Sequence, residues 1–305
     1  MQIETASALS KRFALDLQPK RLVDAEARQI EQIEVSKLRS TVERVVIRAM
    51  ADAESSLRLG ENVGLAVVSE RDLANHALHP EEVQVLSPRA CRRKQVEFAL
   101  GRAAAHFALK QICLENLGPV LRGPAGEPLW SDGVVGSISH CYPRGVAVVV
   151  NGSNRFVIGL DLEAMEGMQE TDISHLVCHA AELDWVRQGL SQERLAMIFS
   201  AKEAVYKAFY PLCRRYIDFK EVELTWFPDQ ERFQGEFLVP LSPSLSQRAT
   251  FVVHCSHHGA LFFSCVIHQL SVERAYVEGR KLDSLVPQNS TTGCLATSEG
   301  GLWYE

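Results

Sequence analysis

The sequence predicts an α+β protein, and two observations support this fold class. Apolar residues recur at helical spacing over residues 88–117 and again over 191–210. Each of these segments is followed by runs of β-branched and aromatic residues separated by turn residues, at 134–150 and at 219–268. Because strands joined by short turns pair as hairpins, we expect the sheets to be antiparallel.

Composition and charge limit the class of protein. The chain has 305 residues, 46% hydrophobic and 23% charged, enough for one large or two ordinary globular domains. Its formal net charge of −6 argues against a general nucleic-acid-binding protein, which needs a broad basic surface. The eight cysteines include no C-x-x-C pair, which favours reduced core residues over a disulfide framework or a zinc site.

The sequence predicts neither a secretory signal nor a membrane span. Residues 1–24 mix charged and apolar side chains without a continuous apolar stretch. The longest apolar runs, near 145–150 and 260–267, are too short to cross a bilayer. We therefore expect a soluble, cytoplasmic protein.

The first predicted helical segment lies near the N-terminus. Residues 24–58 contain neither Pro nor Gly, and their apolar residues recur at helical intervals among charges, so we expect one or two amphipathic helices that end near Gly60. They would pack on the next domain or on a partner. Residues 62–69 then have the alternation of a short strand.

The next helix is expected to begin at Ser87-Pro88, with Ser as N-cap and Pro at the first helical position. It would run to about Leu117, where Gly118-Pro119 stops it. Its basic residues gather early; they are Arg89, Arg92, Arg93, Lys94 and Arg102. A solvated basic face is the simpler interpretation, and a functional one requires phosphates nearby.

A loop-like segment at 122–130 precedes a predicted hairpin, with strands at 134–140 and 146–150. The run 157–163 reads as a third, buried strand that ends in Asp161 and Glu163. Residues two apart in a strand share a face, so these carboxylates form a pair. Mg²⁺ binds through one or two carboxylates plus substrate phosphates, so one interpretation of the pair is a magnesium site. The other is two solvated acidic residues at the end of a strand.

Ser139 and His140 end the first strand of that hairpin. Adjacent strand residues face opposite sides, and the G-x-S-x-G motif is absent, so we reject a nucleophile–base pair of the hydrolase type. A serine and a histidine at a strand end can instead donate hydrogen bonds to a phosphate oxygen. Three consecutive strands would bring this end close to Asp161 and Glu163.

Two further helices are expected at 171–189, which includes Glu182, and from Ser191 to Tyr210-Pro211. In the second, Glu203 and Lys207 lie four residues apart and share a face. A surface ion pair is the simpler interpretation, but Phe199 on the same face indicates the edge of a buried surface.

The C-terminal part is expected to form antiparallel strands at 219–227, 233–239, 251–255 and 261–268. His254, His257 and His258 are close in sequence but lack the spacing of a metal site, so we interpret them as turn and strand-end residues. Residues after Leu270 show little pattern, and 290–301 are expected to be flexible.

Five motifs occur in this order along the chain: Arg93-x3-Glu97-Phe98-x2-Gly101-Arg102, Gly126-x-Pro128-x-Trp130, Gly136-Ser137-Ile138-Ser139-His140, Gly159-Leu160-Asp161-Leu162-Glu163, and Phe199-Ser200-Ala201-Lys202-Glu203-x3-Lys207. The series resembles the 4′-phosphopantetheinyl transferases. Within them it is most similar to the large, pseudo-dimeric type that serves nonribosomal peptide and polyketide synthases, in the enterobactin synthase component D branch. The last two motifs together are specific, whereas either alone is weak.

The resemblance implies two similar α+β halves, related by a pseudo-two-fold axis, with coenzyme A and Mg²⁺ at their interface. It implies a monomer whose half-domains span residues 61–155 and 156–270. A helical extension at 1–60 and a tail at 271–305 lie outside it.

The resemblance also implies roles for residues. The reaction it implies transfers the 4′-phosphopantetheine group of coenzyme A to a serine of an apo carrier protein and releases adenosine 3′,5′-bisphosphate. Asp161, Glu163 and Glu203 would bind Mg²⁺, and Glu203 or Glu182 would accept the proton of that serine. Lys207 would contact a phosphate oxygen or stabilise the leaving group. The remaining set would hold the phosphates of coenzyme A; it comprises Arg93, Arg102, Ser139, His140 and Lys202.

One position departs from the family pattern, in which many relatives have Lys between the Gly and Pro of a G-K-P motif. This chain has Glu127 there, which removes that phosphate contact, and Arg122 is a possible substitute. Three alternatives stay open at this point. They are the same transfer to the acyl carrier protein of fatty acid synthesis, a Mg²⁺-dependent phosphohydrolase, and a non-catalytic binding module.

Overall fold

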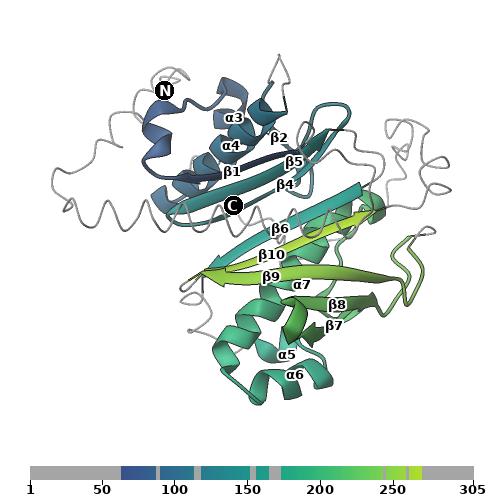
Figure 1. Cartoon of the computed structure of the whole chain (residues 1–305). Helices are drawn as coiled ribbons and strands as arrows, with labels where there is room; N and C mark the ends of the chain where they lie inside the picture. The colour runs from purple at the N-terminus through teal and green to yellow at the C-terminus, as the bar shows by residue number, and fades with distance from the viewer. Residues whose placement is uncertain are drawn as a thin grey trace.

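The computed structural model describes residues 63–86, 90–112, 118–151, 156–164, 173–242, 245–258 and 261–269. The helices predicted for 24–58, the tail after 270 and the proposed helix start at Ser87-Pro88 lie outside the described residues. The described part is an α+β structure with two antiparallel sheets, each packed against one long helix (Figure 1). Every helix in it is too short or too polar to cross a lipid bilayer.

The first sheet consists of β1 (Val63–Ser69), β4 (Val134–Cys141) and β5 (Arg144–Asn151), in the order β1-β5-β4. The predicted hairpin is confirmed by the antiparallel pairing of β4 with β5. Helix α4 (Arg92–Gln111) packs on this sheet through a run of buried alanines. It begins later than predicted, because the extended backbone of Cys91 (φ −64°, ψ 157°) precedes the first helical residue.

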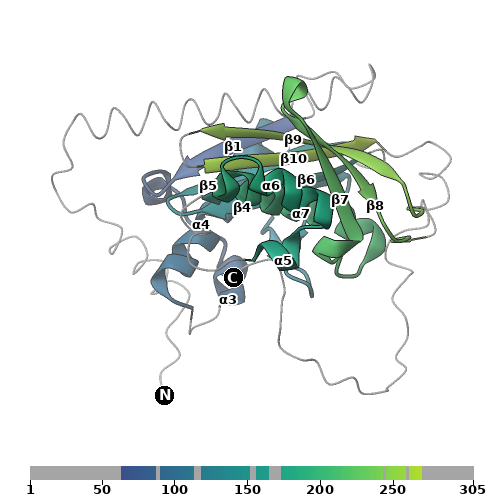
Figure 2. The ribbon, with the colours of Figure 1, turned by 90° about the horizontal axis from the view of Figure 1, so that it is seen from below.

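The second sheet has the order β6-β10-β9-β8-β7. Its strands are β6 (Phe156–Ala164), β7 (Val222–Phe227), β8 (Arg232–Phe237), β9 (Thr250–His258) and β10 (Leu261–Gln269). Helix α7 (Ser191–Cys213) packs on β6 and β10, and α4 and α7 lie on the same side of the two sheets (Figure 2).

Helix α7 does not stop at Tyr210-Pro211, as the sequence suggested, but continues to Cys213. A proline in the last turn removes only the hydrogen bond to the carbonyl of Lys207, so the turn can still close. The helix ends at Arg214, whose left-handed conformation (φ 51°) turns the chain away.

A close helix–strand approach occurs at the same place in both halves. An ideal Cβ on Gly64 of β1 would lie 1.9 Å from the carbonyl oxygen of Ala108 in α4. An ideal Cβ on Gly159 of β6 would lie 1.8 Å from that of Ala204 in α7. Only glycine fits at these positions, and the repetition supports the two-half architecture.

The shorter elements complete the two halves. They are the 3₁₀ turns η1 (Asp72–Asn75), η4 (Phe219–Glu221) and η5 (Pro228–Gln230), the helices α3 (Pro80–Val85), α5 (Ser174–Val177) and α6 (Ala180–Arg187), and the small hairpin of β2 (Leu121–Arg122) with β3 (Pro128–Leu129). The segment expected to be helical over 171–189 is thus two helices, separated at Cys178-His179.

Helix α3 carries a buried carboxylate, Glu82, that is fully enclosed. Its oxygens accept hydrogen bonds from the backbone N–H groups of His79 (3.0 Å) and Val120 (2.8 Å). They also contact Nε2 of His106 on α4 at 2.9 Å. The carboxylate therefore joins a short helix, a long helix and the chain that leads into β2.

Helix α6 repeats this arrangement in the second half with Glu182. Its carboxylate accepts from the backbone N–H groups of His179 (2.6 Å) and Leu224 (2.8 Å), and it pairs with Nζ of Lys202 on α7 at 2.8 Å. Both halves thus use a His-x-x-Glu capping box whose glutamate reaches the long helix. This repetition makes Glu182 part of the architecture.

Candidate active site

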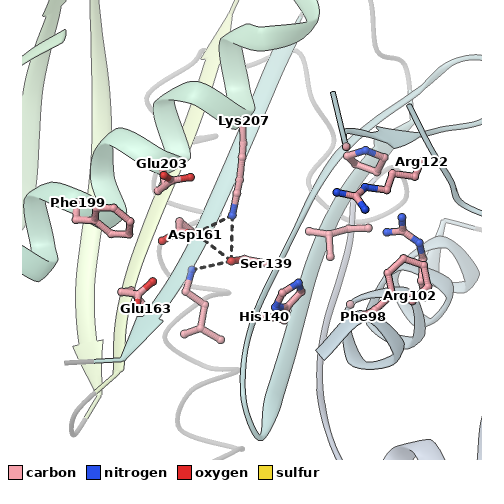
Figure 3. Close-up of a pocket in the computed structure, with 15 residues that line it drawn as sticks. Phe98, Arg102, Arg122, Ser139, His140, Asp161, Glu163, Phe199, Glu203 and Lys207 are labelled. Carbon is pink, nitrogen blue, oxygen red and sulfur yellow. Dashed lines mark hydrogen bonds and ion pairs between the residues drawn. The ribbon is translucent and has the colours of Figure 1, made fainter. Parts of the chain in front are cut away.

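A pocket opens where the two halves meet (Figure 3). Residues from α4, β4, β6, α7 and the β2–β3 segment line it: Phe98, Gly101, Arg102, Arg122, Gly126, Pro128, Ile138, Ser139, His140, Asp161, Leu162, Glu163, Phe199, Glu203 and Lys207. In Figure 3 the basic side chains Arg102 and Arg122 lie on one side and the carboxylates on the other, with Ser139 between them. The pocket therefore has a basic wall and an acidic wall.

The first half supplies the basic wall. Gly101 lets α4 approach β4, because a Cβ there would lie 2.9 Å from Ile138 Cγ2 and 3.5 Å from His140 Cδ2. One turn of helix places Arg102 beside Phe98, with its guanidinium carbon 4.6 Å from the ring centroid. Burial lowers the pKa of Arg102 to about 10, so the guanidinium is still charged at neutral pH.

His140 shares this wall as a neutral ring. Burial, reinforced by the nearby Lys207 ammonium, lowers the pKa of His140 to about 4. The imidazole therefore carries one N–H at neutral pH and can donate a single hydrogen bond to an anion.

The second half supplies the acidic wall. Asp161 and Glu163 are two residues apart on β6, and Glu203 and Lys207 are one turn apart on α7. The Lys207 ammonium donates to Asp161 Oδ1 at 2.7 Å and to Ser139 Oγ at 3.1 Å. The helix and the strand thus bring three carboxylates and one ammonium together. The spacing predicted the two pairs separately, each on one face of its element, and not their meeting.

These carboxylates repel one another in a buried site. Burial, and then the neighbouring Asp161, raise the pKa of Glu203 well above its ordinary value. The same two causes raise the pKa of Glu163 to about 7. Since each carboxylate in turn favours protonation of the next, an added cation would relieve the repulsion.

Two oxygens of the acidic wall fit such a cation. Asp161 Oδ2 and Glu203 Oε1 are buried and make no hydrogen bond within the structure described. Unsatisfied buried oxygens are costly, and hard divalent cations select carboxylate oxygen ligands. Among the described residues, however, no three His, Cys, Asp or Glu side chains form a preformed metal cluster. Lys207 holds one oxygen of Asp161 in this state.

Glu182 and Lys202, predicted as proton acceptor and phosphate ligand, do not line the pocket. Lys202 donates to Glu182 and to the carbonyls of Val177 (2.7 Å) and Phe219 (2.9 Å), so its ammonium is saturated. Both side chains are at most 1% exposed. These two predictions are corrected, because a sealed ion pair offers neither a free oxygen nor a free N–H to a substrate.

Arg93 is also absent from the pocket lining. Its side chain is 68% exposed, pairs with Glu97 at 3.0 Å and lies over the ring of Tyr142. Of the early basic residues on α4, only Arg102 reaches the pocket, because it lies more than two turns further along the helix.

Glu127, at the departure from the family pattern, is buried and satisfied locally. It accepts from the backbone N–H of Ala125 at 3.0 Å and lies 3.6 Å from Arg214 of the second half. Arg122, named as a possible substitute for the missing lysine, lines the pocket.

Ser137 was not assigned a role from the sequence, yet its hydroxyl contacts the backbone of Leu160 in the other half. The sequence feature that could have indicated this contact is its two-residue spacing from Ser139, which places both serines on one face of the strand.

A ligand with phosphate groups would match the basic wall, and a divalent cation bound to such a ligand would match the acidic wall. This combination is typical of sites that bind or transfer phosphoryl groups.

Comparison with known protein families identifies one family. The model of the 4′-phosphopantetheinyl transferase N-terminal domain matches residues 81–150, and that of the 4′-phosphopantetheinyl transferase superfamily matches 157–251.

Curated relatives give the same result. The chain is similar to 4′-phosphopantetheinyl transferase Svp of Streptomyces mobaraensis, with 38% identity over 53% of this chain and 67% of the relative. It is similar to PptT of Mycobacterium tuberculosis, with 32% identity over 52% of this chain and 70% of the relative. Enterobactin synthase component D of Salmonella typhimurium is 36% identical over 39% of this chain and 50% of its own length. The chain belongs to the 4′-phosphopantetheinyl transferase superfamily and is an enzyme of this class.

Proposed function

We propose that this enzyme transfers the 4′-phosphopantetheine group of coenzyme A to a serine of an apo carrier protein in a Mg²⁺-dependent reaction. The observation that carries the proposal is the opposition of the two walls across one pocket. Coenzyme A has a 3′-phosphate and a pyrophosphate, so it needs cationic contacts at two places. Arg102, Arg122 and His140 are suited to the first, and the acidic wall with Lys207 to the second.

Asp161, Glu163 and Glu203 would hold Mg²⁺, and the unsatisfied oxygens of Asp161 and Glu203 support this assignment. When bound there, the ion would neutralise charge on the pyrophosphate. Lys207 would move from Asp161 to a phosphate oxygen and stabilise the charge that develops on the leaving group.

In the transfer, the carrier serine oxygen forms a bond to the β-phosphorus, and the bond from that phosphorus to the bridging oxygen breaks. Adenosine 3′,5′-bisphosphate leaves with the electron pair. We assign the serine proton to Glu203, directly or through a water, because Glu203 lines the pocket whereas Glu182 is sealed.

The proposed carriers are peptidyl, aryl or acyl carrier domains of nonribosomal peptide or polyketide synthases, with siderophore biosynthesis as one setting. The similarity to enterobactin synthase component D supports this choice. Transfer rates to such domains and to the acyl carrier protein of fatty acid synthesis distinguish the two kinds of client.

The decisive experiment is mass spectrometry of an apo carrier domain incubated with the enzyme, coenzyme A and Mg²⁺. Wild type should add one 4′-phosphopantetheine mass, and Asp161→Ala, Glu163→Ala and Glu203→Ala should add none while remaining folded. Asp229→Ala, which removes an exposed carboxylate of the same half, is the matched control. Full modification by all three site variants would refute the metal assignment. Turnover of coenzyme A without a carrier would indicate a phosphohydrolase instead.

A second experiment tests the basic wall. His140→Ala should raise the KM for coenzyme A more than that for dephospho-coenzyme A, which lacks the 3′-phosphate. Equal effects on both substrates would remove His140 from the 3′-phosphate site.

A further inference from the structure

The two halves meet along two strands, β4 and β6, that are the edges of separate sheets. An edge strand has unpaired backbone N–H and C=O groups, and burying them without partners costs free energy. Here side-chain hydroxyls of β4 provide partners for the backbone of β6. Their geometry decides how the basic and acidic walls face each other.

Ser137 makes the first of these contacts. Its hydroxyl accepts from the backbone N–H of Leu160 at 2.9 Å and lies 3.5 Å from the carbonyl oxygen of the same residue. Both Ser137 and Leu160 are fully buried. Since Leu160 immediately precedes Asp161, this contact fixes the backbone that carries the acidic wall.

Ser139 makes the second contact, with the backbone N–H of Leu162 at 3.0 Å. Serines two apart on β4 thus contact leucines two apart on β6 in the same direction, so the two strands run parallel where they meet. We call this contact between β4 and β6 the seam. The Ser139 hydroxyl also donates to Asp161 Oδ1 at 3.0 Å and accepts from Lys207. The hydroxyl proton that the sequence analysis assigned to a phosphate contact is thus donated to Asp161 in this arrangement.

We propose that Ser137 is a positioning residue for phosphopantetheinyl transfer, which sets the separation of the two walls through Leu160. It lies outside the pocket lining, and the hydrogen bonds described for it are to the backbone of Leu160, whereas Ser139 also contacts the Asp161 carboxylate. The inference rests on the proposed function, in which one coenzyme A molecule contacts both walls. Transfer rates are sensitive to displacements of about 1 Å, so a loosened seam affects ligands that span it.

The first arm of the test does not depend on the proposed function. In Ser137→Ala, amide hydrogen exchange measured by NMR should become at least about ten times faster at Leu160, because its N–H loses a buried acceptor. Ser264→Ala is the matched control, since Ser264 is a serine with 1% exposure on β10, inside one sheet. Unchanged exchange at Leu160, or an equal increase in the control, would overturn the proposal.

The second arm compares a ligand that spans the seam with one that does not. Ser137→Ala should weaken binding of coenzyme A with Mg²⁺ about five-fold, whereas adenosine 3′-monophosphate, which reaches only the basic wall, should bind within about two-fold of wild type. Equal weakening of both ligands would refute positioning. If wild type itself binds no coenzyme A, the proposed function fails, while the exchange measurement still decides whether Ser137 holds the seam.

Discussion

Helix α7 carries two buried lysine–carboxylate pairs whose geometry is almost the same and whose surroundings differ. Lys202 lies 2.8 Å from Glu182, and Lys207 lies 2.7 Å from Asp161. In the first pair every polar atom of the carboxylate is enclosed and hydrogen-bonded. In the second, Asp161 Oδ2 has no hydrogen-bond partner in the described structure, and both residues face the pocket.

Enclosure and hydrogen-bond satisfaction distinguish an ion pair that stabilises the fold from one that is available for catalysis. Burial lowers the pKa of Lys202, yet three acceptors surround its ammonium, and the first half repeats the same enclosed carboxylate at Glu82 without any lysine. Because the enclosed carboxylate recurs in the half that has no acidic wall, we assign it a structural role. A buried oxygen without a hydrogen-bond partner at a pocket instead indicates a role in binding or catalysis.

The largest expected effect comes from breaking the sealed pair. Lys202→Ala leaves Glu182 buried without its cation, which should lower the free energy of unfolding by about 3–5 kcal/mol. Denaturant unfolding with Lys207→Ala as the comparison measures this. A loss below that of Lys207→Ala would contradict the structural assignment of the Lys202 pair.

The pocket pair should show the opposite balance. Lys207→Ala should reduce kcat for transfer by about 10²-fold, since an ammonium aimed at developing charge is lost. Its effect on the free energy of unfolding should stay near about 1 kcal/mol, because the Ser139 hydroxyl still donates to Asp161. Carrier-modification kinetics and unfolding on the same sample test both statements. Loss of stability without loss of kcat would reverse the roles of the two pairs.

Double substitutions separate the two roles. Replacing both members of the sealed pair, as Lys202→Met with Glu182→Gln, should recover about 1–3 kcal/mol relative to Lys202→Ala, because no unpaired charge remains buried. Replacing both members of the pocket pair, as Lys207→Met with Asp161→Asn, should recover no activity. If the double variant at the pocket were more active than Lys207→Ala, the loss in Lys207→Ala would come from the unpaired Asp161 and not from the missing ammonium, which would contradict the catalytic role of Lys207.

The smallest effect concerns pH. The pKa of Glu163 is raised to about 7 in the folded protein, so at pH values between the ordinary glutamate pKa and about 7 the folded state binds a proton that the unfolded state has released. The free energy of unfolding therefore falls as the pH rises through this range. Glu163→Gln removes this loss. Measured in a metal chelator, its stabilisation relative to wild type should be larger at pH 8 than at pH 5, by on the order of 1 kcal/mol. An equal Tm difference at both pH values would contradict the raised pKa.

Local periodicity predicted much of the site. The two-residue period of a strand placed Asp161 and Glu163 on one face, and the helical period placed Glu203 and Lys207 together; all four line the pocket. The turn residues around Tyr142-Pro143 predicted the β4–β5 hairpin correctly. These features depend on a few neighbouring residues, which is why the sequence contains them.

Periodicity also has a limit, which Glu182, Lys202 and Arg93 show. Lys202 immediately precedes Glu203 in the family motif, yet one residue rotates its side chain by about 100° around the helix, away from the pocket. Glu182 is sealed by Leu224, a residue 42 positions later. Arg93 remains at the surface beside Glu97.

Sequence patterns therefore predicted most of the helices and strands among the described residues, the shared face of each residue pair at the pocket, and the family. Which of these faces meet depends on the packing of the whole molecule. The contact between β4 and β6 joins residues 23 positions apart through the hydroxyls of Ser137 and Ser139, and no period within either strand specifies it. The pocket exists because the edge strands of two sheets meet, and such long-range contacts are fixed by packing and hydrogen-bond satisfaction across the whole molecule.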